Sequence, residues 1–346
     1  MAKIGIDCRF SLGHSGIGRY TRELVPALLS KATDSHFTLF VRSRDEEWLK
    51  DIAGMCTIVE AAIPHYSIAE QLRMPSFFRK SGIELLFSPH FNVPLRCPVP
   101  FVVTIHDLIL HRYPNQASFL RRRAYHLLMK RSVRRAERII AVSAFTAQEI
   151  SRFYGEGIAD KMTVIHEGVS SQFSPRSEAE QQEVRRRYGL KREFFLYVGN
   201  AKEHKNVQLL LDAYAEAHPQ ADLVLVSEGK ETKNLSFSDG ATLLSSVPDK
   251  HLPALYSAAL AMVTPSLYEG FCLPLLEAVA CGCPVIATNS SAIAELAPPG
   301  VLLIEPDVHA FTHALKNPPP PSKIPHSFSW QSAAEKTLSL LQEACR

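Results

Sequence analysis

The chain has 346 residues, of which 46% are hydrophobic, 21% charged and 9% aromatic. At about 150 residues per domain this length predicts two domains with a core each, and the composition excludes a disordered chain or a small disulfide-stapled one. The longest uncharged stretch, residues 252–268, is interrupted by Pro253 and Pro265. Because a spanning helix needs about 20 apolar residues, we expect no membrane-spanning segment.

Charge and cysteine usage narrow the class further. The net charge of +3 is uneven, since residues 1–170 hold 23 Lys and Arg against 16 Asp and Glu, whereas residues 171–346 hold 15 against 19. This asymmetry predicts an anionic partner for the first half: a phosphorylated substrate, nucleic acid or acidic lipid headgroups. The seven cysteines are scattered, and we interpret the one close pair, Cys281 and Cys283, as packing residues rather than a disulfide or zinc motif. Met1–Asp7 runs into a strand pattern without a secretory signal, which predicts a cytoplasmic protein.

Short aliphatic and β-branched runs alternate with longer amphipathic segments along both halves. The strands predicted in the first half are residues 3–7, 36–42, 83–88, 101–106, 138–143 and 162–166. Those predicted in the second half are residues 194–199, 223–226, 242–247, 260–264, 285–288 and 301–304, with helices at 207–218 and 273–280. This alternation predicts an α/β fold of two doubly wound, parallel-sheet domains.

Irregular segments mark the boundaries of these domains. Residues 166–175 lose their periodicity and gain Gly, Ser and Pro, so we place a boundary at residue 170, with domains at 1–170 and 171–327. The proline run at 317–322 predicts an extended connector, followed by an amphipathic helix at 330–344. In open α/β sheets ligands bind beyond the carboxyl ends of the strands, so we expect the chemistry on strand-to-helix loops.

The strongest functional signal is SLYEGFCLPLLEA at residues 266–278, which follows a predicted strand and opens a helix. Pro274 suits the first helical turn, because it has no N–H to leave unpaired. Four backbone amides lie at the positive end of this helix, where a phosphate binds: Gly270, Phe271, Cys272 and Leu273.

Two carboxylates flank that helix end. Glu269 lies just before it and Glu277 about two turns in, so that the first reaches a sugar hydroxyl and the second a more distant ribose. Taken alone, Glu269 is equally well explained as a helix-start residue and Glu277 as part of a solvated face.

The spacing of Glu269 and Glu277 resembles the E-x7-E motif of the retaining glycosyltransferases of family 4 (glycosyltransferase group 1). Other segments share the resemblance: GIGRYTREL (16–24), TIHDL (104–108), VSAFTAQEI (142–150), VIHEGV (164–169), YVGNAKEHKN (197–206) and CGCPVIA (281–287). The resemblance covers essentially the whole chain and implies the GT-B fold, in which two Rossmann-like domains face each other. It also implies an acceptor-binding first domain, a donor-binding second domain and a C-terminal helix, about 328–346, that returns to the first.

By this resemblance Glu269 contacts the transferred sugar, Glu277 the nucleotide ribose, and Lys205 neutralises the leaving diphosphate. The family often carries an Arg directly after Gly199, but this chain has Asn200 there. The candidates for the missing positive charge are Arg9, Arg19 and His204.

Residues near the first and fourth strands complete the predicted donor site. The glycine-rich loop 13–18, with Gly16 and Gly18, brings backbone amides close to a phosphate or acceptor. Such a loop also resembles that of short-chain dehydrogenases, but no Tyr-x-x-x-Lys accompanies it. The resemblance places His106 beside the donor sugar, where it positions the sugar while the acceptor attacks from the face that the phosphate leaves. A lone strand-end histidine is otherwise a hydrogen-bonding residue, and we interpret Asp107 as structural.

The absence of Asp-x-Asp, the metal-holding pair of the other major glycosyltransferase fold, predicts that no metal or other cofactor is essential. Residues 118–138 carry eight positive charges and one negative, among them Arg121, Arg122 and Arg123. An apolar stripe accompanies them: Leu120, Tyr125, Leu127 and Leu128. This pattern indicates a helix on an anionic membrane or, equally, a solvated face, and no reading motif for nucleic acid is present.

These observations predict a transferase that moves a hexose from a nucleoside diphosphate sugar to a glycan or lipid-linked acceptor. The resemblance favours the mannosyltransferase-like branch that builds surface polysaccharide, with GDP-mannose as donor and a location in the cytoplasm or at the inner membrane face. The alternatives are a UDP-sugar-dependent transferase, an epimerase or hydrolase of nucleotide sugars, and a non-catalytic scaffold.

Overall fold

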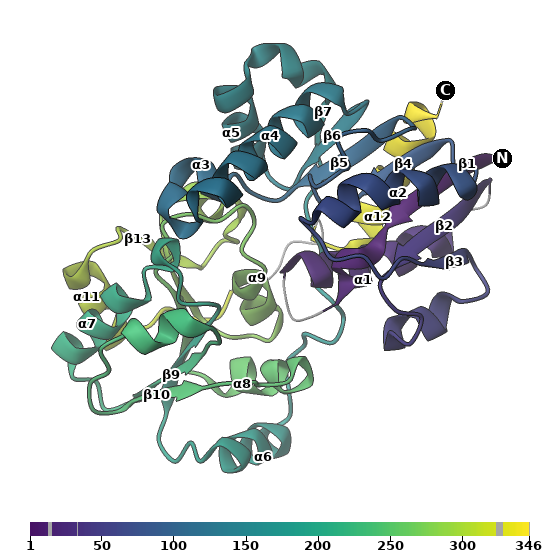
Figure 1. Ribbon diagram of the computed structural model, residues 1–346. Coiled ribbons are helices and arrows are strands. Elements are labelled where there is room, and N and C mark those ends of the chain that lie inside the picture. Colours follow the sequence, from purple (N-terminus) through teal and green to yellow (C-terminus); the bar gives the residue numbers. More distant parts are fainter. Residues whose placement is uncertain (13–15, 33, 323–327, 346) are drawn as a thin grey trace. The chain divides into compact units, whose positions relative to one another are not determined.

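The computed structural model describes residues 1–12, 16–32, 34–322 and 328–345, and the chain divides into two compact units (Figure 1). The N-terminal unit consists of Met1–Gly168 and Ser327–Arg346, and the C-terminal unit of Val169–His326. The chain leaves the first unit two residues before the predicted boundary at 170.

The N-terminal unit is built on a parallel sheet in the order β3-β2-β1-β4-β5-β6-β7. Its strands are β1 (Ala2–Asp7), β2 (Ser35–Val41), β3 (Thr57–Glu60), β4 (Leu85–Ser88), β5 (Phe101–Ile105), β6 (Arg138–Ala141) and β7 (Met162–Val164). Every residue of β4 and β5 is buried, and their mostly apolar sequences are typical of the central strands of a parallel sheet. The sequence did not predict β3, because this edge strand is half-exposed and has polar residues at both ends.

Helices cover this sheet and bring the end of the chain back to its beginning. They are α1 (Gly16–Lys31), α2 (Ile68–Lys80), α3 (Ile109–Arg112), α4 (Phe119–Arg135), α5 (Ala144–Tyr154) and α12 (Trp330–Ala344), with 3-10 turns at Cys8–Ser11, Glu47–Ile52, Pro114–Gln116 and Glu156–Lys161. The side chain of Ser329 caps α12 by accepting a hydrogen bond from the Ser332 amide. Figure 1 shows α12, in yellow, against α1, in purple, so the predicted return of the C-terminal helix is confirmed.

The C-terminal unit has a parallel sheet in the order β10-β9-β8-β11-β12-β13. Its strands are β8 (Phe194–Val198), β9 (Asp222–Val226), β10 (Ala241–Leu244), β11 (Ala261–Thr264), β12 (Val285–Thr288) and β13 (Leu302–Ile304). Its helices are α6 (Glu178–Tyr188), α7 (Val207–Ala217), α8 (Leu252–Ala258), α9 (Leu273–Ala280), α10 (Ser291–Leu296) and α11 (Val308–Lys316), with 3-10 turns at Glu203–Lys205, Lys230–Asn234 and Asp249–His251. The predicted α/β class with two parallel sheets is therefore confirmed.

In both units the strand order reverses beside the first strand. β1 lies between β2 and β4, and β8 lies between β9 and β11. Adjacent loops leave such a switch point in opposite directions and open a crevice at the carboxyl ends of the strands. The loops after β1 and β4, and those after β8 and β11, flank these switch points, and the loop after β5 lies next to the β4 loop at the same edge of its sheet.

Three expectations about the chain as a whole have direct structural counterparts. The seven cysteines are free, and Cys281 and Cys283 are buried. Within the described residues, no helix combines the length and apolarity needed to cross a membrane. The proline run at 317–322 has no regular secondary structure, and the rest of that connector, residues 323–327, lies outside the described residues.

Gly168 lies where the outgoing and returning segments of the N-terminal unit pack together. A Cβ atom at Gly168 would lie 2.2 Å from the backbone nitrogen of Trp330 and 2.6 Å from the carbonyl carbon of Ser329. Trp330 is 3% exposed, and its ring packs edge-on against Tyr20 at 5.7 Å. Because backbone atoms of a capped helix end cannot move aside easily, only glycine fits at this position.

We therefore expect Gly168→Ala to destabilise the protein by about 1–3 kcal/mol, through overpacking against the start of α12. Urea unfolding followed by circular dichroism measures this change in free energy. Gly157→Ala is the matched control, because a Cβ there has nothing within 4 Å. Equal stability of the two variants would show that Gly168 and the start of α12 can move apart without a cost in the free energy of unfolding.

Candidate functional site

The loop after β8 begins with a turn that requires glycine. Gly199 has a φ of 155°, and a Cβ there would lie 2.9 Å from the Tyr197 hydroxyl oxygen. That hydroxyl donates a 2.6 Å hydrogen bond to the carbonyl oxygen of Asn200. The Asn200 side chain is exposed, and its Oδ1 accepts a 3.2 Å hydrogen bond from the Lys202 amide. At the position where the family often carries Arg, Asn200 thus fixes the shape of its own loop.

Lys205 and Glu269, predicted as catalytic, are brought together by the loops after β8 and β11. The Lys205 Nζ atom lies 2.5 Å from the Glu269 Oε1 atom, and the two side chains are 18% and 12% exposed. Lys205 ends a 3-10 turn, after which Asn206 adopts a left-handed conformation and begins α7. The pair is therefore held at the carboxyl edge of the sheet in a partly desolvated setting, where its electrostatic attraction is stronger than in water.

The helix that follows Glu269 is α9, Leu273–Ala280, with the predicted bounds. Cys272 precedes it in a left-handed conformation, with a φ of 73°, and Pro274 occupies the first helical turn. The Glu269 amide donates a 2.9 Å hydrogen bond to Ser291 Oγ, which ties this loop to α10. Gly270, Phe271, Cys272 and Leu273 are all buried, so the predicted phosphate-binding segment is a packed turn with a defined backbone path.

Glu277 occupies a different position from the one its spacing predicts. It lies one helical turn after Leu273, not two turns into the helix, because α9 begins only at Leu273. Its side chain is 1% exposed and accepts a 3.4 Å hydrogen bond from the Tyr256 hydroxyl. The alternative that Glu277 belongs to a solvated face is therefore wrong.

Two of the three candidates for a second positive charge are excluded by their surroundings. His204 is 7% exposed, and burial together with the charges of Lys205 and Lys202 lowers its pKa to about 3. His204 is therefore neutral near pH 7. Arg9 is 0% exposed and forms ion pairs with Asp7 at 2.6 Å and with Glu70 at 2.7 Å. Its guanidinium is thus a structural group, which corrects the expectation that it serves the donor phosphates.

The predicted glycine-rich loop is helical where the structure describes it. Gly16 and Gly18 lie in the first turn of α1, Gly16 exposed and Gly18 buried, and neither has a positive φ. The expectation of a loop over both residues is therefore wrong, since helical hydrogen bonding begins at Gly16. Residues 13–15 lie outside the described residues.

His106 follows β5 and is hydrogen-bonded through both ring nitrogens. Its Nδ1 lies 3.0 Å from Glu167 Oε1, and its Nε2 lies 2.9 Å from the carbonyl oxygen of Pro89. The neighbouring Asp107 accepts a 2.9 Å hydrogen bond from the Ile109 amide at the start of α3. Glu167 has no role that the sequence predicts, although VIHEGV contains it, because a contact across 61 residues leaves no local pattern.

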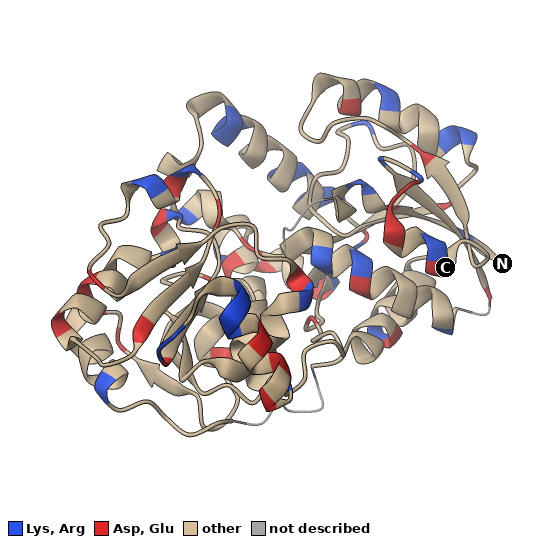
Figure 2. Ribbon diagram, turned by 90° about the horizontal axis from the view of Figure 1, so that it is seen from below, with Lys and Arg blue, Asp and Glu red and all other residues tan. Residues whose placement is uncertain are grey.

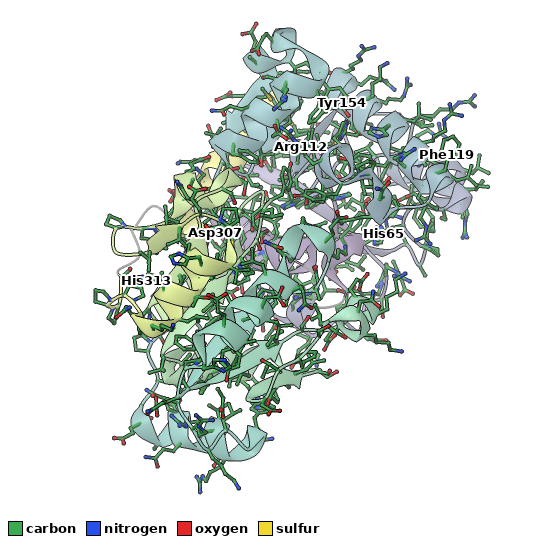
Figure 3. All side chains as sticks on the ribbon, turned by 90° about the vertical axis from the view of Figure 1, so that its left-hand side faces the viewer. His65, Arg112, Phe119, Tyr154, Asp307 and His313 are labelled. Atoms are coloured by element: carbon green, nitrogen blue, oxygen red, sulfur yellow. The ribbon has the colours of Figure 1, made fainter. Side chains whose placement is uncertain are left out.

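The basic segment forms α4, which has seven Lys and Arg residues and no Asp or Glu, so it is blue without red in the colouring of Figure 2. Its buried face consists of Tyr125, Leu128, Met129, Ser132 and Val133. The predicted apolar stripe is therefore partly wrong, because Leu120 and Leu127 are 78% and 55% exposed. They lie outside the core together with Phe119, which is labelled in Figure 3 and is 58% exposed.

The guanidinium groups of Arg122 and Arg123 lie 5.8 and 5.0 Å from the centre of the Phe119 ring. Arg121 and Arg123 are exposed and Arg122 is half-buried. The described residues contain no group of three or more His, Cys, Asp or Glu side chains placed to hold a metal ion.

Two parallel-sheet units with a Lys–Glu pair beside an E-x7-E helix define the chain as a glycosyltransferase of the GT-B fold. The family profile described as Glycosyl transferases group 1 matches residues 180–322, and that described as Glycosyltransferase Family 4 matches residues 14–173. The chain belongs to this family, glycosyltransferase family 4, and the resemblance drawn from its motifs is confirmed.

Individual relatives agree with this assignment. The chain is 30% identical over 332 residues to O-antigen chain mannosyltransferase B of Escherichia coli, covering 88% of this chain and 87% of that protein. It is 29% identical over 244 residues to O-antigen chain mannosyltransferase RfbU of Salmonella typhimurium, covering 68% and 64%. Among solved structures, sucrose-phosphate synthase from Thermosynechococcus elongatus matches with a TM-score of 0.72 at 19% identity, over 100% of this chain and 95% of that one.

Replacing the buried Arg9 tests its structural role. We expect Arg9→Leu to lower the free energy of unfolding by about 3–5 kcal/mol, because Asp7 and Glu70 would remain as buried carboxylates without their cation. Chemical denaturation at pH 7 measures the loss. The control is Lys31→Ala, which removes an exposed pair with Glu335 and should change stability by about 0–1 kcal/mol. An unchanged midpoint for Arg9→Leu would contradict the structural assignment.

Proposed function

We propose that the protein transfers mannose from GDP-mannose to a glycan or lipid-linked acceptor during the synthesis of a surface polysaccharide, with retention of configuration and without an essential metal or cofactor. The support for the sugar and the process is the similarity to two O-antigen mannosyltransferases. The observation that carries the chemistry is the Lys205–Glu269 ion pair at the start of α9.

Charge neutralisation is the main demand of this reaction, because the leaving nucleoside diphosphate gains negative charge as the glycosidic bond breaks. In our proposal Lys205 exchanges its ion pair with Glu269 for the diphosphate, and Glu269 then accepts hydrogen bonds from hydroxyls of the transferred sugar. The start of α9 adds the positive end of a helix dipole for a phosphate. Glu277, buried in that helix, contacts the ribose, and His106 contacts the sugar.

The same pair argues against a non-catalytic scaffold. A partly buried Lys–Glu pair in two loops contributes little stability once its desolvation is counted. Placing both charges at the ligand-binding edge of the sheet therefore serves a ligand better than it serves the fold. A UDP-sugar donor has the same diphosphate, so Lys205 would serve either donor, and the base and the sugar distinguish a UDP-sugar from GDP-mannose.

Calorimetric titration with GDP, UDP, ADP and TDP in metal-free buffer tests the donor. We expect GDP to bind in preference to the others. Lys205→Ala should weaken GDP binding and, like Glu269→Ala, abolish transfer with the fold preserved, because each removes one partner of the diphosphate and sugar. Lys202→Ala is the matched control, since Lys202 lies on the same loop and its backbone amide, which the substitution keeps, donates the hydrogen bond to Asn200.

Each other result redirects the assignment. Selective binding of UDP would replace GDP-mannose by a UDP-sugar, and binding of no nucleotide would favour the scaffold. Full transfer by Lys205→Ala or Glu269→Ala would contradict the site, and consumption of donor without acceptor would indicate an epimerase or hydrolase.

We further propose that the start of α4 contacts the anionic inner face of the membrane, where a lipid-linked acceptor resides. Phe119 and Leu120 provide exposed apolar surface, and Arg121, Arg122 and Arg123 provide positive charge beside it. The second half of the helix serves its own unit, since Arg131 and Arg135 donate hydrogen bonds to the Leu95 carbonyl oxygen. An apolar tip ringed by cations is the pattern of an interfacial helix.

Vesicle sedimentation tests this contact. Replacing Arg121, Arg122 and Arg123 by Gln should weaken partitioning onto phosphatidylglycerol vesicles roughly a hundredfold, because each cation near the surface contributes about 1 kcal/mol. The control replaces Arg185, Arg186 and Arg187 of α6, an equal loss of charge on a helix whose cations pair with Glu193 and Glu183. Equal sedimentation of both variants would leave α4 as a solvated face.

A further inference from the structure

Glu167 has a contact that its family motif does not explain. It lies next to Gly168, where the chain leaves the N-terminal unit, yet it is 4% exposed and its Oε1 lies 3.0 Å from Nδ1 of His106. On the other side of the same ring, Nε2 lies 2.9 Å from the Pro89 carbonyl oxygen.

The two partners fix the protonation of the ring. A carbonyl oxygen only accepts hydrogen bonds, and an ionised carboxylate also only accepts them. Both ring nitrogens must therefore carry a proton to satisfy both contacts, and His106 is then an imidazolium. Neutral His106 has one proton and would leave one of these buried acceptors without a donor.

The other groups that face the ring agree with this charge. Asp107 adds a second negative charge nearby. His90 lies on the other side, and burial together with the charge of His106 lowers its pKa well below the ordinary value, so that it is neutral. The hydroxyl of Tyr20 pairs with Thr104, its ring meets His106 edge-on at 4.7 Å, and burial raises its pKa, so it adds no charge.

The same contacts connect the ring to the two segments that join the units. Tyr20 packs edge-on against both His106 and Trp330, and Gly168 lies against the backbone of Trp330. The His106 ring therefore cannot turn without displacing the packed ring of Tyr20 or breaking its hydrogen bonds. Its ring is held at the carboxyl end of β5, at the edge where α/β domains present ligand-binding groups.

We infer that Glu167 is a positioning residue that holds His106 in one orientation and in its cationic form at the carboxyl end of β5. This inference rests on the proposed function for its consequence in catalysis, because His106 is the residue proposed to contact the donor sugar. Because both of its N–H groups are engaged by Glu167 and Pro89, the fixed imidazolium acts on the substrate through its positive charge and the contacts of its ring, and it cannot act as a base.

The pair also has a defined pH dependence. Burial alone would lower the pKa of His106, but the hydrogen bond and charge of Glu167, together with Pro89 and Asp107, raise it above 6.5. Because the folded chain binds this proton more tightly than the unfolded chain, the pair stabilises the fold fully below pH 6.5 and loses this effect as the pH rises through the raised pKa.

NMR titration of the histidine Cε1 protons tests the inference without any substrate. We expect His106, assigned from the spectrum of His106→Gln, to titrate above pH 6.5 in the unaltered protein. In Glu167→Gln its pKa should fall by about 1–3 units, because the amide keeps an oxygen near Nδ1 but removes the charge. Glu149→Gln is the matched control, since Glu149 is equally buried but pairs with Arg112, labelled in Figure 3. An unshifted His106 in Glu167→Gln would overturn the inference.

The pH profile of kcat/KM tests the consequence for transfer. In Glu167→Gln the alkaline limb should move to lower pH by the same amount as the NMR titration, and Glu167→Asp should restore part of the shift. If Glu167→Gln fails to fold, Glu167→Asp serves both measurements with a smaller shift in the same direction. A shifted titration with an unchanged pH profile would overturn the positioning role. Failure of transfer with every donor would contradict the proposed function, while the NMR result would still decide the charge of His106.

Discussion

A charge withdrawn from water must meet an opposite charge, and this constraint organises the carboxyl edges of both sheets. The N-terminal unit buries Arg9 with Asp7 and Glu70, and His106 with Glu167. The C-terminal unit holds Lys205 against Glu269. Three of these contacts, Arg9–Glu70, His106–Glu167 and Lys205–Glu269, join segments that are more than 60 residues apart, so satisfying the charges also fixes how these segments sit beside one another.

The burial of each pair decides whether it stabilises the fold or can exchange one partner for a ligand. Arg9 is fully buried, and displacing it would leave the carboxylates of Asp7 and Glu70 without their cation. Lys205 and Glu269 keep 18% and 12% of their side-chain surface in contact with water, which is the basis for our proposal that a diphosphate replaces the carboxylate as the partner of the lysine. His106 lies between these cases, because its two hydrogen-bonding positions are filled from within its own unit.

The elements that could be predicted from the sequence are those whose residues are all buried or that begin with a clear local signal. β5 and β12 are uniformly buried and consist of apolar residues with one threonine each, and α9 has Pro274 at its start, so their positions followed from local chemistry. Half-exposed β3 lacked such a pattern. The resemblance pointed to Lys205 and Glu269 as residues, whereas their contact across 64 residues, like that of His106 with Glu167, depends on the whole topology. For the same reason the burial of Arg9 could not be foreseen from its place after the first strand.

In the proposed donor site, Asn200 leaves the diphosphate with one cation fewer than the family often provides at this position. His204 is neutral and Arg9 is committed to two carboxylates, so neither replaces the missing arginine. Of the three candidates only Arg19, half-buried in α1, remains, and it belongs to the other unit. Within the C-terminal unit the positive field must therefore come from Lys205 and the amides at the start of α9. In the proposed site Lys205 supplies the side-chain charge of this unit for the diphosphate, and its ion pair with Glu269 holds the ammonium group in place before the donor binds.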